Sequence, residues 1–199
     1  MQPERDIDVR WRPISLLFKN ETPEDSDYFA PVNFTHKILR VMMAVQAAAD
    51  TPTAGNDAMF RMYRQAGTWI HQDGDSDFTA AELLEATGLD TEHAAAFDDE
   101  QWDIVIREGM DEGLAIVGTD VGTPIIAIER SDGQPAGYFG PVISKVPPAD
   151  KGLAMWDGLL AMMEVDSFFE LKRTRSGRLD FGDRPADRLT VPTSVDCVR

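Results

Sequence analysis

Apolar residues recur at helical spacing through the middle of the chain. Three stretches place them on one face of a helix, at intervals of three and four residues. The faces consist of Phe34, Ile38, Val41, Met42, Val45 and Ala49, then Met59, Met62, Tyr63, Ala66 and Ile70, then Trp102, Ile106, Met110, Leu114 and Val117. A short helix between the last two begins at a capping box of Thr79 and Glu82 and ends at Gly88. The pattern predicts a helical block over residues 32–118.

Segments typical of strands lie on either side of the helical block. Residues 8–18, DVRWRPISLLF, combine β-branched, aromatic and aliphatic residues and predict a strand, with Pro13 at a bulge or an edge. Residues 123–129 predict a second strand. After a turn rich in Gly, Asp and Pro, residues 138–143 predict its antiparallel partner, so that the two form a hairpin.

One more helix and a polar tail follow the hairpin. Asp150 can cap a helix whose apolar face continues to Met163, and from about residue 176 the sequence is polar. The order of strand, helical block, two strands and helix predicts an α/β sheet that carries a helical subdomain.

The composition is that of a globular protein with a large acidic excess. The 199 residues include 35 Asp and Glu against 19 Lys and Arg, so the formal net charge is −16. Such a charge argues against nucleic acid as a partner, and the short basic cluster at 170–178 does not outweigh it. No apolar run is long enough to span a membrane, and the charged start MQPERDID lacks the features of a secretory signal. We therefore expect a cytoplasmic protein that binds neither nucleic acid nor membrane.

The sequence offers little for metal or disulfide chemistry. Its one cysteine, Cys197, excludes a disulfide framework and a Cys-based zinc site, and we interpret it as incidental. The histidines His36, His71 and His93 have no ligand spacing, and the acidic loop 73–77 lacks the glycine and glutamate of a calcium-binding loop. No dinucleotide, phosphate-loop or nucleophile-elbow motif is present. We expect no metal, and His71 keeps two interpretations, packing or the lining of a ligand pocket.

Several short stretches together are similar to the DsbA-like mycothiol-dependent nitroreductase family. They are SLLFKNE at 15–21, WIHQDG at 69–74, GMDEGLAIVGTDVGTPIIAI at 109–128, FGPVISKVP at 139–147, AMWDG at 154–158 and FFELKRTR at 168–175. The similarity runs from about Asp6 to Arg175. It is specific because the succession from DVGTP through FGPV to FFELKRTR defines both residue types and spacing.

The resemblance implies a thioredoxin-like fold of the DsbA type with an inserted helical subdomain. An α/β domain would comprise residues 1–31 and 119–175, the helical subdomain residues 32–118, and a polar tail residues 176–199. The implied activity is thiol-dependent reduction through a Cys-x-x-Cys pair. Mycothiol, a low-molecular-weight thiol, would be the cofactor, and a small electrophile the substrate.

The resemblance also implies the residues of a site. Pro124 matches the cis-proline of the family, and with Thr123 it would form a wall of the active site. Asn20 and Tyr28 match positions that line the substrate site, and His71 matches a family histidine in the helical block. Asn20, Tyr28 and His71 are therefore the candidates for substrate binding, and Thr123 and Pro124 are the candidates for the wall of the active site.

The sequence departs from the family at the dithiol. The family carries its Cys-x-x-Cys pair ahead of the segment that matches residues 9–18, and this sequence contains no such pair. The strand before that pair would lie between the strands matching 9–17 and 123–129. Its loss would leave buried backbone groups unpaired, at about 1–3 kcal/mol each. We therefore expect the N-terminal strand and helix to be missing, and the chain as given to be inactive in dithiol chemistry.

Three explanations of this departure stay open. In the first, which we favour, the start is misassigned or cut and the dithiol lies upstream. In the second, a natural truncation repacks or borrows a strand from a partner. In the third, the fold is intact in another form and has a binding role. The alternatives to a reductase are a catalytically dead thioredoxin-fold binding module and an isomerase or transferase that uses the thiol of a cofactor. The sequence leaves the oligomeric state and the natural substrate open.

Overall fold

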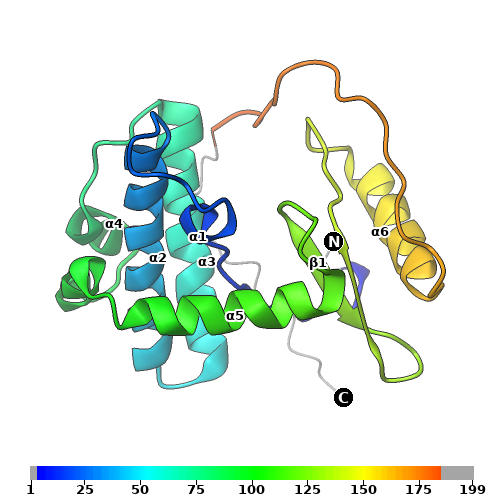
Figure 1. Ribbon diagram of the computed structural model, residues 1–199, viewed down its shortest axis with the longest axis horizontal. Helices are drawn as coiled ribbons and strands as arrows, with labels where there is room; N and C mark the ends of the chain where they lie inside the picture. Colours follow the sequence, from blue (N-terminus) through cyan, green and yellow to red (C-terminus); the bar gives the residue numbers. More distant parts are fainter. Residues whose placement is uncertain (1–3, 185–199) are drawn as a thin grey trace. The chain divides into compact units, whose positions relative to one another are not determined.

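The computed structural model describes residues 4–184, which divide into two compact units. One unit, residues 7–110 with residue 184, is helical. The other, residues 4–6 and 111–183, contains a β-hairpin and a helix (Figure 1). Helix α5 (Trp102–Val117) begins in the helical unit and ends in the hairpin unit.

Two long consecutive helices, α2 (Phe29–Ala48) and α3 (Pro52–Thr68), pack side by side in the helical unit (Figure 1). The hydroxyl of Thr51 starts α3 by accepting a hydrogen bond from the N–H of Ala54 at 3.1 Å. Pro52 follows at the first helical position, where its missing N–H costs nothing. The unit also contains α1 (Leu16–Lys19), a π-helical turn η2 (Trp69–Asp73), α4 (Ala80–Ala86) and a 3-10 segment η3 (Thr91–Asp98).

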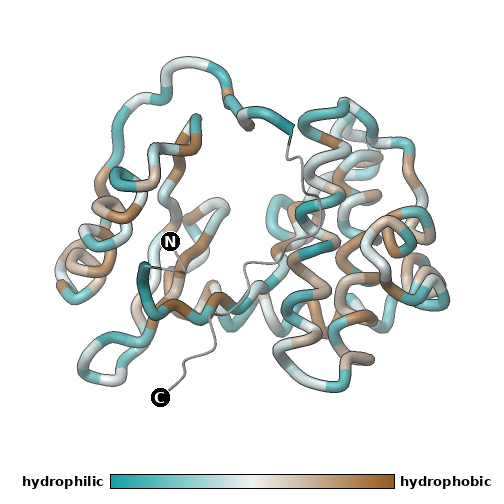
Figure 2. The backbone as a smooth tube through the Cα atoms, turned by 180° about the vertical axis from the view of Figure 1, so that it is seen from behind, coloured by the Kyte–Doolittle hydropathy of each residue, from teal (hydrophilic) through white to brown (hydrophobic). Residues whose placement is uncertain are grey.

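The apolar faces predicted from the sequence meet in the core of this unit. Five side chains of the core have no exposed surface at all: Val41, Met62, Leu83, Leu84 and Ile106. Figure 2 shows how hydrophobic and hydrophilic positions alternate along these helices. The predicted capping box is also present, because Thr79 and Glu82 exchange side-chain-to-backbone hydrogen bonds. The prediction of a helical block is therefore confirmed.

The strand predicted over residues 8–18 is wrong. Residues 7–15 belong to no strand, and Leu16–Lys19 form helix α1. Ser15 caps this helix, because its hydroxyl accepts a hydrogen bond from the N–H of Phe18 at 3.2 Å. Pro13 has no N–H to donate to a sheet ladder, and Ser15 favours the start of a helix. Both residues therefore oppose a strand near the end of the expected segment.

A side chain takes the place of a partner strand for this segment. The amide oxygen of Asn56 accepts from the N–H of Trp11 at 2.8 Å, and its nitrogen donates to the C=O of Val9 at 2.9 Å. The ring of Trp11 stacks on Phe60 and Tyr63, with centroid distances of 5.1 and 6.2 Å. The β-branched and aromatic residues that predicted a strand are therefore used in packing on helix α3.

The hairpin unit contains β1 (Ile125–Glu129), β2 (Pro135–Phe139) and α6 (Ala149–Met163). The strands are antiparallel, with Ala127 opposite Gly137, and α6 packs against β2. The returning strand begins at Pro135 rather than at residue 138, because the turn closes early through the N–H of Arg130 and the C=O of Gln134.

The described residues contain one sheet, and it has two strands. Of the predicted α/β class, the described residues show a helix-rich chain with a small two-stranded antiparallel sheet. The strand expected at 8–18 is not formed, and the thioredoxin-like arrangement of the sheet stays a prediction. Among the helices of residues 4–184, none combines the length and the apolar character needed to cross a bilayer.

Two glycines of α3 test the close packing of α2 on α3. A Cβ at Gly55 would lie 2.9 Å from the backbone oxygen of Gln46, whereas a Cβ at Gly67 meets no atom within 4 Å. Gly55→Ala should destabilise the protein by about 1–3 kcal/mol. Gly67→Ala should stabilise it by about 0.5–1 kcal/mol, because alanine favours a helix. Urea denaturation measures both changes, and stabilisation by both variants would contradict the close approach at Gly55.

Candidate functional site

Thr123 and Pro124, the predicted wall of the active site, lie at the entrance to the hairpin. The peptide bond between them is cis. The C=O of Pro124 accepts a hydrogen bond from the N–H of Gly140 at 2.8 Å, which ties the entrance of β1 to the exit of β2. A Cβ at Gly122 would lie 3.2 Å from the ring of Phe139, so the backbone before Thr123 runs close to that ring. Thr123 and Pro124 are both exposed in the described part of the chain.

The other three predicted site residues belong to the helical unit, and all three are exposed. Asn20 ends helix α1, and its N–H donates to the C=O of Leu16 at 3.1 Å. Tyr28 precedes α2 and has 74% of its surface exposed. His71 lies in the π-helical turn η2, a kind of turn that is frequent at functional sites. The five candidates are thus divided between the two units, and their joint role stays a prediction.

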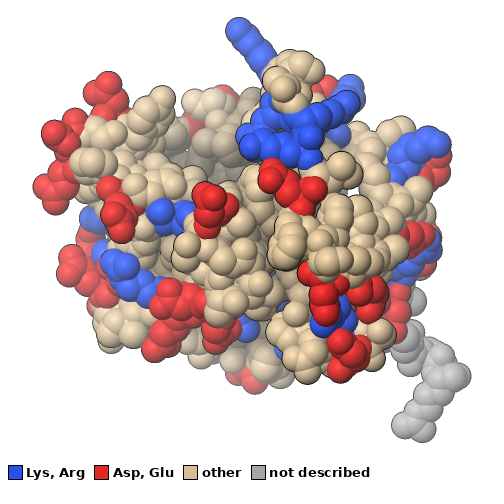
Figure 3. Space-filling model, turned by 45° about the vertical axis from the view of Figure 1, so that its right-hand side comes forward, with Lys and Arg blue, Asp and Glu red and all other residues tan. Residues whose placement is uncertain are grey.

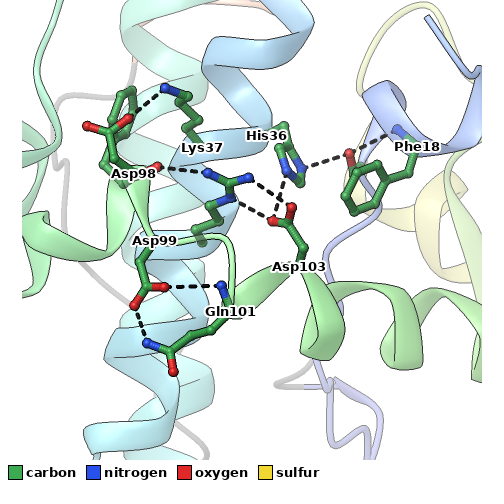
Figure 4. A network of polar contacts seen from close by, with 10 residues as sticks. Phe18, His36, Lys37, Asp98, Asp99, Gln101 and Asp103 are labelled. Carbon is green, nitrogen blue, oxygen red and sulfur yellow. Dashed lines mark hydrogen bonds and ion pairs between the residues drawn. The ribbon is translucent and has the colours of Figure 1, made fainter.

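A chain of hydrogen bonds that the sequence analysis missed runs through the helical unit (Figure 4). The Oγ of Ser15 lies 3.0 Å from Nδ1 of His36, and Nε2 of His36 lies 3.1 Å from Oδ1 of Asp103. Arg40 donates to both oxygens of Asp103, from Nε at 2.6 Å and from Nη2 at 2.8 Å. These four residues are called the buried network below.

Local structure explains how the buried network assembles. His36 and Arg40 lie four residues apart in α2, so their side chains leave the same face of the helix. Asp103 lies in the first turn of α5, where the helix dipole favours a carboxylate. Ser15 is fixed as the cap of α1. The network therefore links the consecutive helices α1 and α2 to α5, which begins more than fifty residues after α2 ends.

The hydrogen bonds of the buried network are all satisfied with a neutral His36. With its proton on Nε2, the ring donates to Asp103, and its Nδ1 accepts from the hydroxyl of Ser15, which itself accepts from the N–H of Phe18. A second proton on Nδ1 would turn the Ser15 hydroxyl away from its acceptor. Burial likewise lowers the pKa of His36, and the charges of Arg40 and Arg107 add to this, although Asp103 opposes it.

The carboxylate of Asp103 stays charged. Burial alone would raise the pKa of Asp103, but the hydrogen bonds from Arg40 and His36 and the charge of Arg40 outweigh burial and lower it. Arg40 is held charged in return, because the hydrogen bonds that it donates to Asp103 raise its pKa. The network is thus a buried ion pair with a neutral histidine beside it.

The order Ser, His, Asp does not make this network a hydrolase site. Only 1% of the surface of Ser15 and 2% of that of His36 is exposed, so no substrate reaches them. Arg40 occupies both oxygens of Asp103, and the ring of Phe18 covers the imidazole at a centroid distance of 4.4 Å. A nucleophile needs access to its substrate and an oxyanion hole beside it. The network is structural.

The sequence carried no clear signal for the network. His36 and Arg40 are four positions apart, and at about 100° per residue they lie on the side of the helix away from the apolar face of Ile38 and Val41. A polar pair on that side is typical of a solvated face, whereas in the structure both residues are buried and therefore need partners. The sequence could not identify Asp103 as their partner, since the carboxylate comes from a helix more than sixty residues away.

The state of His36 predicts how stability depends on pH. The folded-state pKa is lowered below the unfolded value of about 6.5, so the unfolded chain binds the proton more readily. The contribution is fully present above about pH 6.5 and is lost as the pH falls towards the folded-state pKa. The slope of unfolding free energy in that window should reach at most about 1.4 kcal/mol per pH unit. Urea denaturation at several pH values measures it.

His36→Gln is the control for this pH dependence. The glutamine amide can still donate to Asp103 but does not titrate, so the part of the slope due to His36 should disappear. An unchanged slope in the variant would show that His36 is not the group responsible.

Among the described residues, no group of three or more His, Cys, Asp or Glu side chains is placed to hold a metal ion. Cys197, the one cysteine, lies outside the described residues. The predicted site residues at the hairpin entrance and in the helical unit are exposed, so a small molecule can reach them from solvent.

A comparison with protein families finds a match that covers most of the chain. The model of the Rv2466c-like family, described as mycothiol-dependent nitroreductase Rv2466c, matches residues 1–173. The matched range includes most of both units and all five predicted site residues.

Proposed function

The chain belongs to the Rv2466c-like family of mycothiol-dependent nitroreductases, and from this premise we propose that it reduces small nitro compounds at the expense of thiols. The family is one of thiol-dependent oxidoreductases. In this proposal mycothiol is the reductant and a small nitro compound is the electrophilic substrate. Family membership over most of the chain is the observation that carries the proposal.

The proposed reaction balances with two thiols. One thiolate attacks the activated electrophile, and a second thiol resolves the adduct as a disulfide, so that two electrons and two protons are transferred. A nitro group that accepts them becomes a nitroso group and releases one water. Two molecules of mycothiol then return the disulfide to the dithiol and are themselves oxidised to a disulfide.

The unpaired edge of β1 is the proposed position for the strand that carries the dithiol. Pro124 with Gly140 and Arg130 with Gln134 form hydrogen-bonded pairs at the two ends of the hairpin. Hydrogen-bonded and non-hydrogen-bonded pairs alternate in an antiparallel ladder. The N–H and C=O groups of alternate residues, Ile125, Ala127 and Glu129, therefore point away from β2. In the described part of the chain no strand pairs with them.

The two edges of the hairpin differ in how readily they pair with a further strand. β2 begins with Pro135, whose missing N–H weakens pairing at its outer edge. β1 carries Ile125, Ile126 and Ile128 with no proline or lysine among its residues, and such an edge readily pairs with another strand. We propose that a strand bearing the Cys-x-x-Cys pair adds to β1 and completes a thioredoxin-like sheet.

The remaining predicted residues have roles in this proposal. Thr123 and Pro124 would form the wall opposite the dithiol, because they directly precede β1. Asn20, Tyr28 and His71 would line the substrate site. The proposed α/β domain comprises residues 1–31 and 119–175, and the helical subdomain residues 32–118.

Hydrogen exchange tests whether the edge of β1 is used in this way. In the chain alone, the amides of Ala127 and Glu129 should exchange fast, whereas those of Ile126 and Ile128, which face β2, should be protected. In the protein purified from its own cell, Ala127 and Glu129 should be protected as well if the dithiol strand is paired there. Fast exchange of these two amides in a protein that reduces nitro compounds would contradict the proposed position of the strand.

Activity decides between the reductase and its alternatives. We expect the protein from its own cell to reduce a nitroaromatic compound with mycothiol. Ligand-induced stabilisation without turnover would instead identify a binding module. Turnover by the chain as given that needs added mycothiol and survives Cys197→Ser would identify a thiol-cofactor transferase or isomerase.

A further inference from the structure

The segment between Phe168 and Asp180 is a loop with both ends held to the hairpin unit. The hydroxyl of Tyr138 donates to the C=O of Phe168 at 2.6 Å, and the two rings pack at a centroid distance of 5.7 Å. At the other end, the N–H of Asp180 donates to the C=O of Ser144 at 2.7 Å. The Asp180 carboxylate pairs with Nζ of Lys145 at 3.0 Å. Residues 169–179, called the basic loop, are exposed throughout.

The basic loop concentrates positive charge on a strongly acidic protein. Four of the 19 basic residues of the chain lie within seven positions of it, and they are Lys172, Arg173, Arg175 and Arg178. None of the four forms an ion pair with any residue in the described part of the chain. Figure 3 shows Lys and Arg side chains gathered at the top of the view. Phe169 and Leu171, at the start of the loop, each have 83% of their surface exposed.

The helical unit carries a segment of opposite character. Residues 21–28, called the acidic turn, contain four acidic residues within seven positions and no basic residue. These residues are Glu21, Glu24, Asp25 and Asp27, and within residues 4–184 none of them forms an ion pair. Tyr28 ends the acidic turn with 74% of its surface exposed.

We propose that the basic loop of one copy of this chain docks on the acidic turn of a second copy. Four positive charges over seven positions match four negative charges over seven positions, and each segment adds large exposed apolar or aromatic side chains. Each copy carries both segments. In the proposed dimer the two copies pair reciprocally about a two-fold axis, so that the contact forms twice and no segment is left to bind a third copy.

The overall charge of −16 favours the acidic turn of a second copy over other anions as the partner of the basic loop. A nucleic acid meets a net repulsion from the whole chain, whereas the acidic turn brings a local charge of matching size and length. At physiological ionic strength charges act over about 8 Å, so the groups in contact govern pairing more than the distant acidic excess. The dimer would bring the basic loop of one copy beside Tyr28 of the other. This proposal does not depend on the reaction proposed above.

Charge reversal in the full-length chain tests the dimer. Sedimentation velocity at several protein concentrations should show a reversible exchange between one and two copies. R173E/R175E should raise the dissociation constant about tenfold or more, because like charges then face the acidic turn. R10E/K151E is the matched control: it changes the net charge equally at two exposed residues outside both segments, and the dissociation constant should stay near that of the wild type.

The reciprocal exchange completes the test. E24K/D25K should weaken the dimer as R173E/R175E does, and the four substitutions together should restore it, since the charges again match. A chain that stays monomeric at its highest soluble concentration would overturn the proposal. Equal weakening by R173E/R175E and by R10E/K151E, or a fourfold variant that does not recover, would overturn it too. So would a monomer that becomes more compact at low salt, because the segments would then meet within one chain.

Discussion

Replacing Arg40 by methionine should lower the free energy of unfolding by about 3 kcal/mol. The variant keeps most of the packing volume but leaves the carboxylate of Asp103 without its two charged donors. Breaking a buried ion pair from one side costs about 3–5 kcal/mol, and the lower end applies here because the Asp103 side chain is 21% exposed. Urea denaturation at pH 7 measures the loss.

Lys37→Met is the matched control, because Lys37 is a cation of the same helix with its own carboxylate partner. Its Nζ lies 2.6 Å from Oδ1 of Asp98, but the Asp98 side chain is 76% exposed. Exposed ion pairs contribute about 0–1 kcal/mol, so this variant should lose no more than that. Equal losses in the two variants would show that burial of the Arg40 pair has no special effect.

The second large effect is expected from Ile106→Ala, with a loss of about 2–5 kcal/mol. Ile106 has no exposed surface and packs in the core of the helical unit, so its truncation leaves a cavity. Thermal and urea denaturation both measure the change. The loss should be reduced if neighbouring methionines such as Met62 and Met110 move into the space, because their side chains are flexible.

Ile104→Ala in the same helix is the control for Ile106→Ala. Ile104 is 62% exposed, so the same truncation two positions away removes little buried surface. We expect a change within about 0.5 kcal/mol, as for most surface substitutions. A loss at Ile104 as large as that at Ile106 would mean that this face of α5 is covered in solution.

The sequence alone was sufficient to identify the family. Short stretches from SLLFKNE to FFELKRTR identified the nitroreductase family, and the family match over residues 1–173 confirms it. What the match does not provide is the dithiol, because the one cysteine of this sequence, Cys197, follows the matched range. The proposed chemistry therefore depends on what pairs with the edge of β1.

The sequence by itself determined the features that depend on neighbours along the chain. Helical spacing placed Val41, Met62 and Ile106 in the core, and the capping box at Thr79 started α4 where predicted. These signals are local, because residues three and four positions apart share a face and a capping side chain reaches only the next turn. The turn of the hairpin was located for the same reason, with an error of a few residues at β2.

Only the tertiary structure decided the features that need a partner from elsewhere in the chain. Residues 8–18 have the composition of a strand, but Asn56 supplies their hydrogen bonds and Phe60 their packing surface. His36 and Arg40 found Asp103 on another helix. Strand propensity reflects only how well side chains fit a pleated surface, and a charged residue that becomes buried requires a partner that its neighbours in sequence do not define. The strand or the charged partner is determined only when distant segments come into contact.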